Sequence, residues 1–142
     1  MFETSYSTTQ LAKLFDISPR QLQWIDERDI VQPRCVGHRR EWTAAEAIEV
    51  GIISELRRKG LSLQMTRRVI RSARRLRLKD SAPIGYLTTD GKMVAICFNP
   101  NDLLDRLKTA RRGIVVVSIE DVAARVQMNV RVLDMAEGDQ VA

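Results

Sequence analysis

Two short helical segments separated by a tight turn restrict the fold of this 142-residue chain more than any other feature. The hydroxyl residues Ser7-Thr8-Thr9 precede LAKLF, in which Leu11 and Leu14 fall on one helical face. A hydroxyl at this position can accept a hydrogen bond from a free N–H group at the start of a helix. Asp16-Ile17-Ser18 then predicts a turn. The sequence therefore indicates a first helix that ends near Phe15.

A second helix is predicted from Pro19 to about Arg28. Ser18-Pro19 is a strong start signal, because Ser is a good N-cap and Pro is well tolerated at the first helical position. Leu22 and Ile25 fall on the face that would turn inward. Two short helices joined by a tight turn are typical of a helix-turn-helix.

The segment from Ile30 to Trp42 is predicted to form a short hairpin, or wing, with His38-Arg39-Arg40 at its tip. Thr43 and Glu46 then form a capping box that opens a third helix ending near Gly60. This helix is expected to bury Ile48, Ile52 and Leu56. Ser62 is expected to cap a fourth helix that runs to about Leu78, with Met65, Val69, Ala73 and Leu76 along one stripe.

The charge is distributed unevenly between the two halves of the chain. Residues 1–79 carry 16 Lys and Arg against 9 Asp and Glu, whereas residues 80–142 carry 7 against 9. From Leu56 to Lys79 there are ten basic residues and no acid. Pairs such as Arg67 with Arg71 repel one another across one helical turn. Such a run is either a solvated face or a surface that lies near a polyanion, and its single sign favours the polyanion.

A second module is predicted after Asp80-Ser81-Ala82-Pro83. Two strands, Ile84 to Thr88 and Lys92 to Phe98, flank the hairpin signal Asp90-Gly91. Asn99-Pro100 opens a helix, IVVVSI forms a buried strand, and a last short helix runs to Val126. The predicted fold class is α+β: a winged helix-turn-helix domain over residues 1–79, followed by a small ββαβα module over residues 80–142.

Several classes of function find no support in the sequence. The longest apolar runs are too short to span a bilayer, and the first ten residues lack the pattern of a signal peptide. Cys35 and Cys97 are isolated, so neither a disulfide framework nor a metal site is expected. The lone histidine, His38, has no partners for a catalytic triad. We expect no enzyme, no cofactor and a cytoplasmic location.

The first half of the chain resembles the MerR family of bacterial transcription regulators and, more loosely, the phage excisionases. The likeness runs through YSTTQLAKLFDISPRQLQWIDERDIVQP, then GHRREWTAAEA, then ISELRRKGLSLQ. The shared features are an aromatic residue before the first helix, SP-x-x-L at the second, a Gly-x-Arg-x-x-aromatic wing, and Gly-x-Ser-Leu between the third and fourth helices. The ordered set covers slightly more than half of the chain.

The resemblance implies that the partner is double-stranded DNA and that the protein is associated with the nucleoid. It also implies a role for each matched position. The recognition helix would place five side chains in or beside the major groove, the wing would place arginines near phosphate with an aromatic packed beneath, and a second wing would contact the backbone. These residues are Ser18, Arg20, Gln21, Gln23 and Trp24, then Arg39, Arg40 and Trp42, and finally Arg57, Arg58, Lys59 and Ser62, with Arg67 on the basic fourth helix. Trp24 is equally compatible with a core position.

The sequence departs from the family pattern in four respects. The family usually has Arg where Gln23 stands and an aromatic residue where Ile25 stands. The long coiled-coil helix through which members dimerise is replaced by the module from Ile84 onward, and the cysteine clusters of metal-sensing members are absent. No effector site is therefore implied. We expect a homodimer held by residues 80–142, through the edges of the hairpin or of the IVVVSI strand.

The primary hypothesis is a sequence-specific transcription regulator that binds a palindromic operator as a dimer. One alternative is an excisionase-like architectural factor that bends DNA. Another is an antitoxin or adaptor protein whose second module binds a protein partner.

Overall fold

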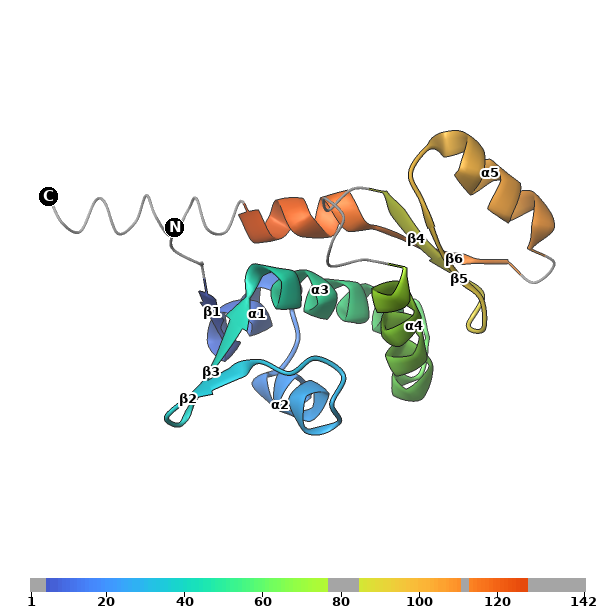
Figure 1. The fold of residues 1–142 in the computed structure, drawn as a ribbon. Helices are drawn as coiled ribbons and strands as arrows, with labels where there is room; N and C mark the ends of the chain where they lie inside the picture. The colour runs from blue at the N-terminus through green and yellow to red at the C-terminus, as the bar shows by residue number, and fades with distance from the viewer. Residues whose placement is uncertain (1–4, 77–84, 111–112, 128–142) are drawn as a thin grey trace, which may run out of the picture. The chain divides into compact units, whose positions relative to one another are not determined.

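The computed structural model describes residues 5–76, 85–110 and 113–127, and its fold is α+β, as the sequence predicts (Figure 1). In chain order the elements are β1 (Ser5–Ser7), α1 (Thr8–Phe15), α2 (Pro19–Glu27), β2 (Arg34–Val36), β3 (Arg39–Thr43), α3 (Ala44–Arg58), α4 (Leu63–Arg75), β4 (Tyr86–Thr89), β5 (Val94–Cys97), α5 (Pro100–Thr109) and β6 (Val115–Ser118). A further helix covers residues 119–127. The chain divides into two compact units, residues 1–50 with the segment from 121 onward, and residues 51–120.

The first unit contains the helix-turn-helix, α1 and α2, and a three-stranded antiparallel sheet in the order β1-β3-β2. The hairpin of β2 and β3 is the predicted wing. Its turn lies at Gly37-His38, where Gly37 has a φ of +64° that an L side chain rarely adopts. The prediction that Arg39 and Arg40 lie at the tip is wrong, because both belong to β3, where Arg39 pairs with Val36 and Arg40 with Cys35.

Three helix starts follow the predicted capping chemistry. Ser7 caps α1 in a box with Gln10, and Ser18 caps α2 in a box with Gln21. At the start of α3, the Thr43 hydroxyl accepts from the Glu46 N–H at 3.1 Å. The Glu46 carboxylate accepts from the Thr43 N–H at 2.8 Å. These bonds satisfy N–H groups that lack a partner within the helix, and they fix where each helix begins.

The core of the first unit is built around aromatic residues. Tyr6 and Trp42 are directly paired across β1 and β3, and both are buried. Phe15 is buried with Leu11, whereas the predicted Leu14 is only half-buried. Residues 121–127 of the last helix belong to this core, with Val122, Ala123 and Val126 buried. The first unit is therefore completed by a segment that follows the whole second unit in the chain.

A hydrogen bond joins β1 to the last helix within this core, and its removal is expected to lower stability. The Tyr6 hydroxyl donates to the Val126 carbonyl at 3.2 Å. Tyr6→Phe is expected to lower the free energy of unfolding by about 0.5–1.5 kcal/mol, because a buried carbonyl loses its donor. Denaturant unfolding measures the change. Tyr86→Phe is the control, since Tyr86 is 36% exposed. An equal or larger loss in the control would contradict the assignment.

The second unit combines the end of α3 and all of α4 with the sheet β5-β4-β6 and α5. Helix α4 contacts β5, and α5 contacts β4 and β5. The predicted stripe of α4 is corrected in part: Val69 and Ala73 are buried, whereas Met65 is half-buried and Leu76 is 46% exposed. Helix α4 is Leu63–Arg75 with Leu76 as its C-cap, and the predicted end near Leu78 lies outside the described residues.

The third helix also differs from prediction in one position. Ile52 and Leu56 are buried as expected, whereas Ile48 is half-buried. Ile53, which was not predicted, is buried as well. The inward face of α3 is therefore wider than a single stripe. The helix ends at Arg58, and Gly60 follows with a φ of +96°.

The second module has the predicted order of elements. Strands β4 and β5 pair antiparallel around Asp90-Gly91, and β6 pairs with the other side of β4. Asn99 caps α5 through its side chain, which accepts from the Asp102 N–H at 2.9 Å. The predicted boundary after residue 79 falls in residues 77–84, which lie outside the described residues, and it stays a prediction.

Candidate nucleic-acid interface

Helix α2 presents a polar face on a firmly held backbone. Leu22 and Ile25 are buried and fix the helix against the core of the first unit. The residues predicted for recognition are exposed on its other faces and line a shallow depression of about 450 Å³. This depression brings together Ser18, Arg20, Gln21, Gln23, Trp24 and Glu27. Because the helix itself is rigidly packed, these side chains have a fixed origin, as recognition of base edges requires.

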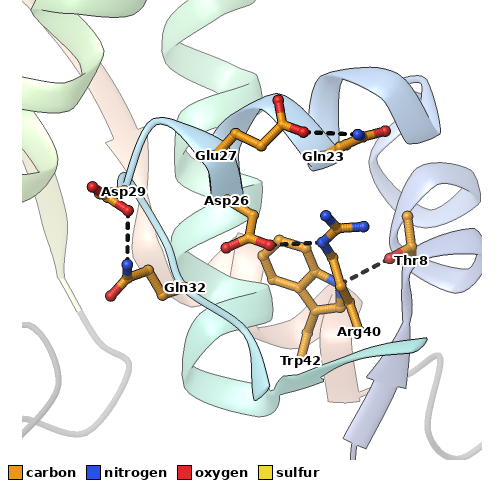
Figure 2. Close-up of polar contacts among 8 residues, drawn as sticks. All are labelled: Thr8, Gln23, Asp26, Glu27, Asp29, Gln32, Arg40 and Trp42. Atoms are coloured by element: carbon orange, nitrogen blue, oxygen red, sulfur yellow. Dashed lines mark hydrogen bonds and ion pairs between the residues drawn. The ribbon is translucent and has the colours of Figure 1, made fainter. Parts of the chain in front are cut away.

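Three of these side chains already have partners within the helix. The Ser18 hydroxyl accepts from the Gln21 N–H at 3.1 Å, and the Gln21 side-chain oxygen accepts from the Ser18 N–H at 2.9 Å. The Gln23 amide donates to the Glu27 carboxylate at 2.8 Å (Figure 2). A base contact by Gln23 therefore has to replace or share the bond to Glu27.

Arg20 differs from its neighbours on α2. It is exposed, and the structure gives it no partner among the residues described. Its guanidinium has the donor geometry that suits the two acceptors of guanine in the major groove. Trp24 is 38% exposed rather than in the core, and the Arg28 guanidinium carbon lies 5.2 Å from the centroid of its ring. Arg28 thereby makes a cation–π contact that keeps the Trp24 ring on the exposed side of α2.

An ion pair connects the wing to the recognition helix. The Arg40 Nε atom on β3 donates to the Asp26 carboxylate on α2 at 2.7 Å, with both side chains largely covered (Figure 2). The hydrogen bond to Asp26 raises the pKa of Arg40 above its ordinary value. This contact uses the guanidinium edge that holds Nε, so Arg40 fixes the angle between wing and helix. Sequence reasoning missed Asp26, because no local pattern signals a contact between residues 14 positions apart.

Trp42 supports the wing from below. Its side chain has no exposed surface, and its indole N–H donates to the Thr8 hydroxyl at 3.2 Å (Figure 2). Trp42 therefore acts on a ligand only through the position of β3. Arg39, two positions before Glu41 on the same strand, is exposed and has no ion-pair partner among the described residues.

A groove of about 720 Å³ lies in the first unit between the N-terminal segment, the start of α2 and the wing. Its walls combine hydroxyl groups with basic side chains, a combination that suits phosphate oxygens. The lining residues are Ser5, Tyr6, Ser7, Thr8, Thr9, Gln10, Pro19, Arg20, Gln23, His38, Arg39, Arg40 and Glu41. Sequence reasoning assigned no role to the hydroxyl residues beyond capping, although their density before α1 was visible in the sequence.

The predicted second wing, between α3 and α4, belongs to the second unit. The Arg57 guanidinium donates to the Leu61 carbonyl at 3.1 Å, and Arg58 pairs with Glu55 at 3.1 Å. Lys59 is exposed and has no ion-pair partner among the described residues. Ser62 caps α4 by accepting from the Met65 N–H at 3.2 Å. Arg57 therefore stabilises the loop through its bond to a backbone carbonyl, while the charge of Lys59 is available to bind a ligand.

Arg67 lies half-buried on α4, one turn after the loop. Its Nε atom is buried and has no hydrogen-bond partner among the described residues. An unsatisfied buried N–H is costly, so this side chain is held by the packing around it rather than by a polar contact.

These features together define a winged helix-turn-helix DNA-binding domain. Residues 6–73, just under half of the chain, match the family model described as MerR HTH family regulatory protein. These residues are therefore similar to the MerR family of DNA-binding transcription regulators. No curated protein sequence matches the chain. None of the helices within the described residues is long and apolar enough to cross a membrane.

Proposed function

We propose that the protein recognises a specific DNA sequence through α2 and binds a palindromic operator as a homodimer. The observation that carries this proposal is the exposed polar face of α2. Within the described part of the chain Arg20 has no ion-pair or hydrogen-bond partner, and the helix is fixed by Leu22, Ile25 and the ion pair from Arg40 to Asp26. A side chain recognises bases only if its backbone is held to a fraction of an ångström. Burial of Leu22 and Ile25 and the ion pair from Arg40 to Asp26 support such a fixed position for α2.

In this proposal the side chains have different tasks. Arg20, Gln21 and Gln23 contact base edges, while Ser18 and Trp24 lie beside them at the entry to the groove. Arg39, with hydroxyl groups of the groove described above, holds the phosphate backbone, and Arg40 and Trp42 position the wing. Arg57, Arg58, Lys59 and Ser62 form a second phosphate contact, in which Lys59 supplies the free charge.

The dimer is proposed to form through residues 80–142. Strands β5 and β6 each pair with β4 on one side only, so the other edge of each strand offers backbone groups to a second strand. Strand β6 is VVVS, without the charged residues that usually protect a sheet edge. Three apolar side chains of the same module, Phe98, Leu104 and Leu107, are about half exposed. A second copy of this chain would cover them.

A selection of bound sequences from random duplex DNA tests the proposal. The expected product is one palindrome, with half-sites one helical turn, about 10 base pairs, or a multiple apart. Light scattering of the unbound protein should give twice the 16.2 kDa mass of the chain. Enrichment of direct repeats would instead indicate an architectural factor of the excisionase type. No enrichment at all, or a monomer at high concentration, would overturn the specific or the dimeric part of the proposal respectively.

A further inference from the structure

Helix α4 carries an arginine face that the family assignment does not explain. It contains five arginines and no acid over its 13 residues. Arg68, Arg71 and Arg75 follow one another at intervals of three and four residues, so they form one stripe along the helix. All three are exposed, and the structure gives them no ion-pair partner among the residues described. We call Arg68, Arg71 and Arg75 the α4 arginine stripe.

The opposite face of α4 is already occupied. Thr66, Val69, Ile70 and Ala73 are buried, with at most 1% of each exposed, and the helix contacts β5. A basic amphipathic helix that binds a membrane surface needs a free apolar face to insert. Helix α4 has none to offer, so only its charge is available to a partner.

The stripe costs stability in the absence of a partner. Arg71 stands one turn from both Arg67 and Arg75, and like charges at this spacing repel by about 0.2–0.5 kcal/mol per pair. No acidic side chain on α4 offsets this repulsion. The stripe runs from Arg68 to Arg75, which is seven steps along the helix, or about 10 Å, and matches roughly three base-pair steps of duplex DNA. A row of phosphates at this spacing would neutralise it.

We propose that the α4 arginine stripe binds the phosphate backbone of duplex DNA and supplies affinity that is independent of base sequence. The proposal rests on the DNA binding proposed above and adds a contact outside the residues assigned there. Arginines without fixed acceptors hold phosphates but carry no information about bases. The stripe would therefore raise the affinity for operator and for random DNA by the same factor.

The test compares two triple variants with the same change of charge. Arg68→Gln/Arg71→Gln/Arg75→Gln removes the stripe. Lys92→Gln/Arg106→Gln/Lys108→Gln is the matched control, because it removes three basic side chains from another part of the same unit. Binding to the selected operator and to random duplex is measured at several salt concentrations. Each lost phosphate contact lowers the slope of log affinity against log salt by about 0.9, so the stripe variant should lose about 2.7.

The expected pattern has three parts. The stripe variant loses affinity for operator and random duplex equally, the control variant keeps the wild-type slope, and the stripe variant melts at the same temperature as the wild type or higher, because repulsion is removed. Equal slopes in the two variants would overturn the proposal. A second outcome would also overturn it. In that outcome single-stranded RNA competes more strongly than duplex DNA of the same length, and this difference disappears in the stripe variant. If wild-type protein bound no DNA at all, the function proposed above would fail instead.

Discussion

Replacement of Trp42 by alanine is expected to lower the free energy of unfolding by about 3–5 kcal/mol and to abolish DNA binding at 37 °C. Trp42 is the largest fully buried side chain in the described part of the chain, and it supports β3 beneath the wing. Its removal leaves a cavity in the core of the first unit and breaks the hydrogen bond to Thr8. Because most domains are stable by only about 5–15 kcal/mol, a loss of this size removes a large part of the stability on which DNA binding at 37 °C depends.

The second tryptophan provides the control for this experiment. Trp24 is 38% exposed on α2, so Trp24→Ala should change the free energy of unfolding by less than about 1 kcal/mol while it weakens DNA binding. Denaturant unfolding and operator binding are measured on both variants. Equal destabilisation by the two substitutions would contradict the assignment of Trp42 as a packing residue and Trp24 as a surface residue.

Arg20→Ala is expected to weaken operator binding by about 1–3 kcal/mol, or roughly 5- to 150-fold, with little change in stability. The reason is that an exposed guanidinium without a polar partner among the described residues can pair bidentately with guanine, and its removal breaks no ion pair or hydrogen bond among them. The affinity for random duplex should fall much less, so the ratio between operator and random DNA should fall. Competition binding with both duplexes measures this ratio.

Two further variants separate base recognition from attraction of charge. Arg20→Lys keeps the charge but not the planar fork, so it should behave like Arg20→Ala in the specificity ratio. Lys59→Ala should lower both affinities alike and reduce the salt slope by about 1. If Arg20→Ala lowered both affinities by the same factor, Arg20 would be a phosphate contact and base recognition would depend on other residues of α2.

Much of the fold follows from signals within a few residues of each other. Ser18-Pro19, Thr43 with Glu46, and Asp90-Gly91 each predicted a helix start or a turn that the structure contains. Such signals work because capping bonds and turn conformations depend on neighbours in the chain. The buried positions were predicted less well. Leu14 and Ile48 are half-buried, because the width of a helix's inward face depends on which elements cover it.

The candidate site was predictable in its location but not in its contacts. The sequence placed the recognition residues on one helix, and α2 carries them on its exposed faces. It could not show that Arg40 is bound to Asp26, since the two residues meet only when the wing folds against α2. Nor could it show that Gln23 is held by Glu27, because a pair at this spacing forms only for particular rotamers. Arg20 stands out only after these internal pairs are known.

The return of residues 121–127 to the first unit has a consequence for the order in which the parts of the chain fold during synthesis. The bond from Tyr6 to Val126 links groups 120 positions apart. A chain emerging from the ribosome can form α1, α2 and the wing early, but the core around Tyr6 stays open until residue 126 is free. Contacts so distant in sequence also close slowly. The DNA-binding domain, although it stands first in the chain, should therefore be among the last parts to reach full stability.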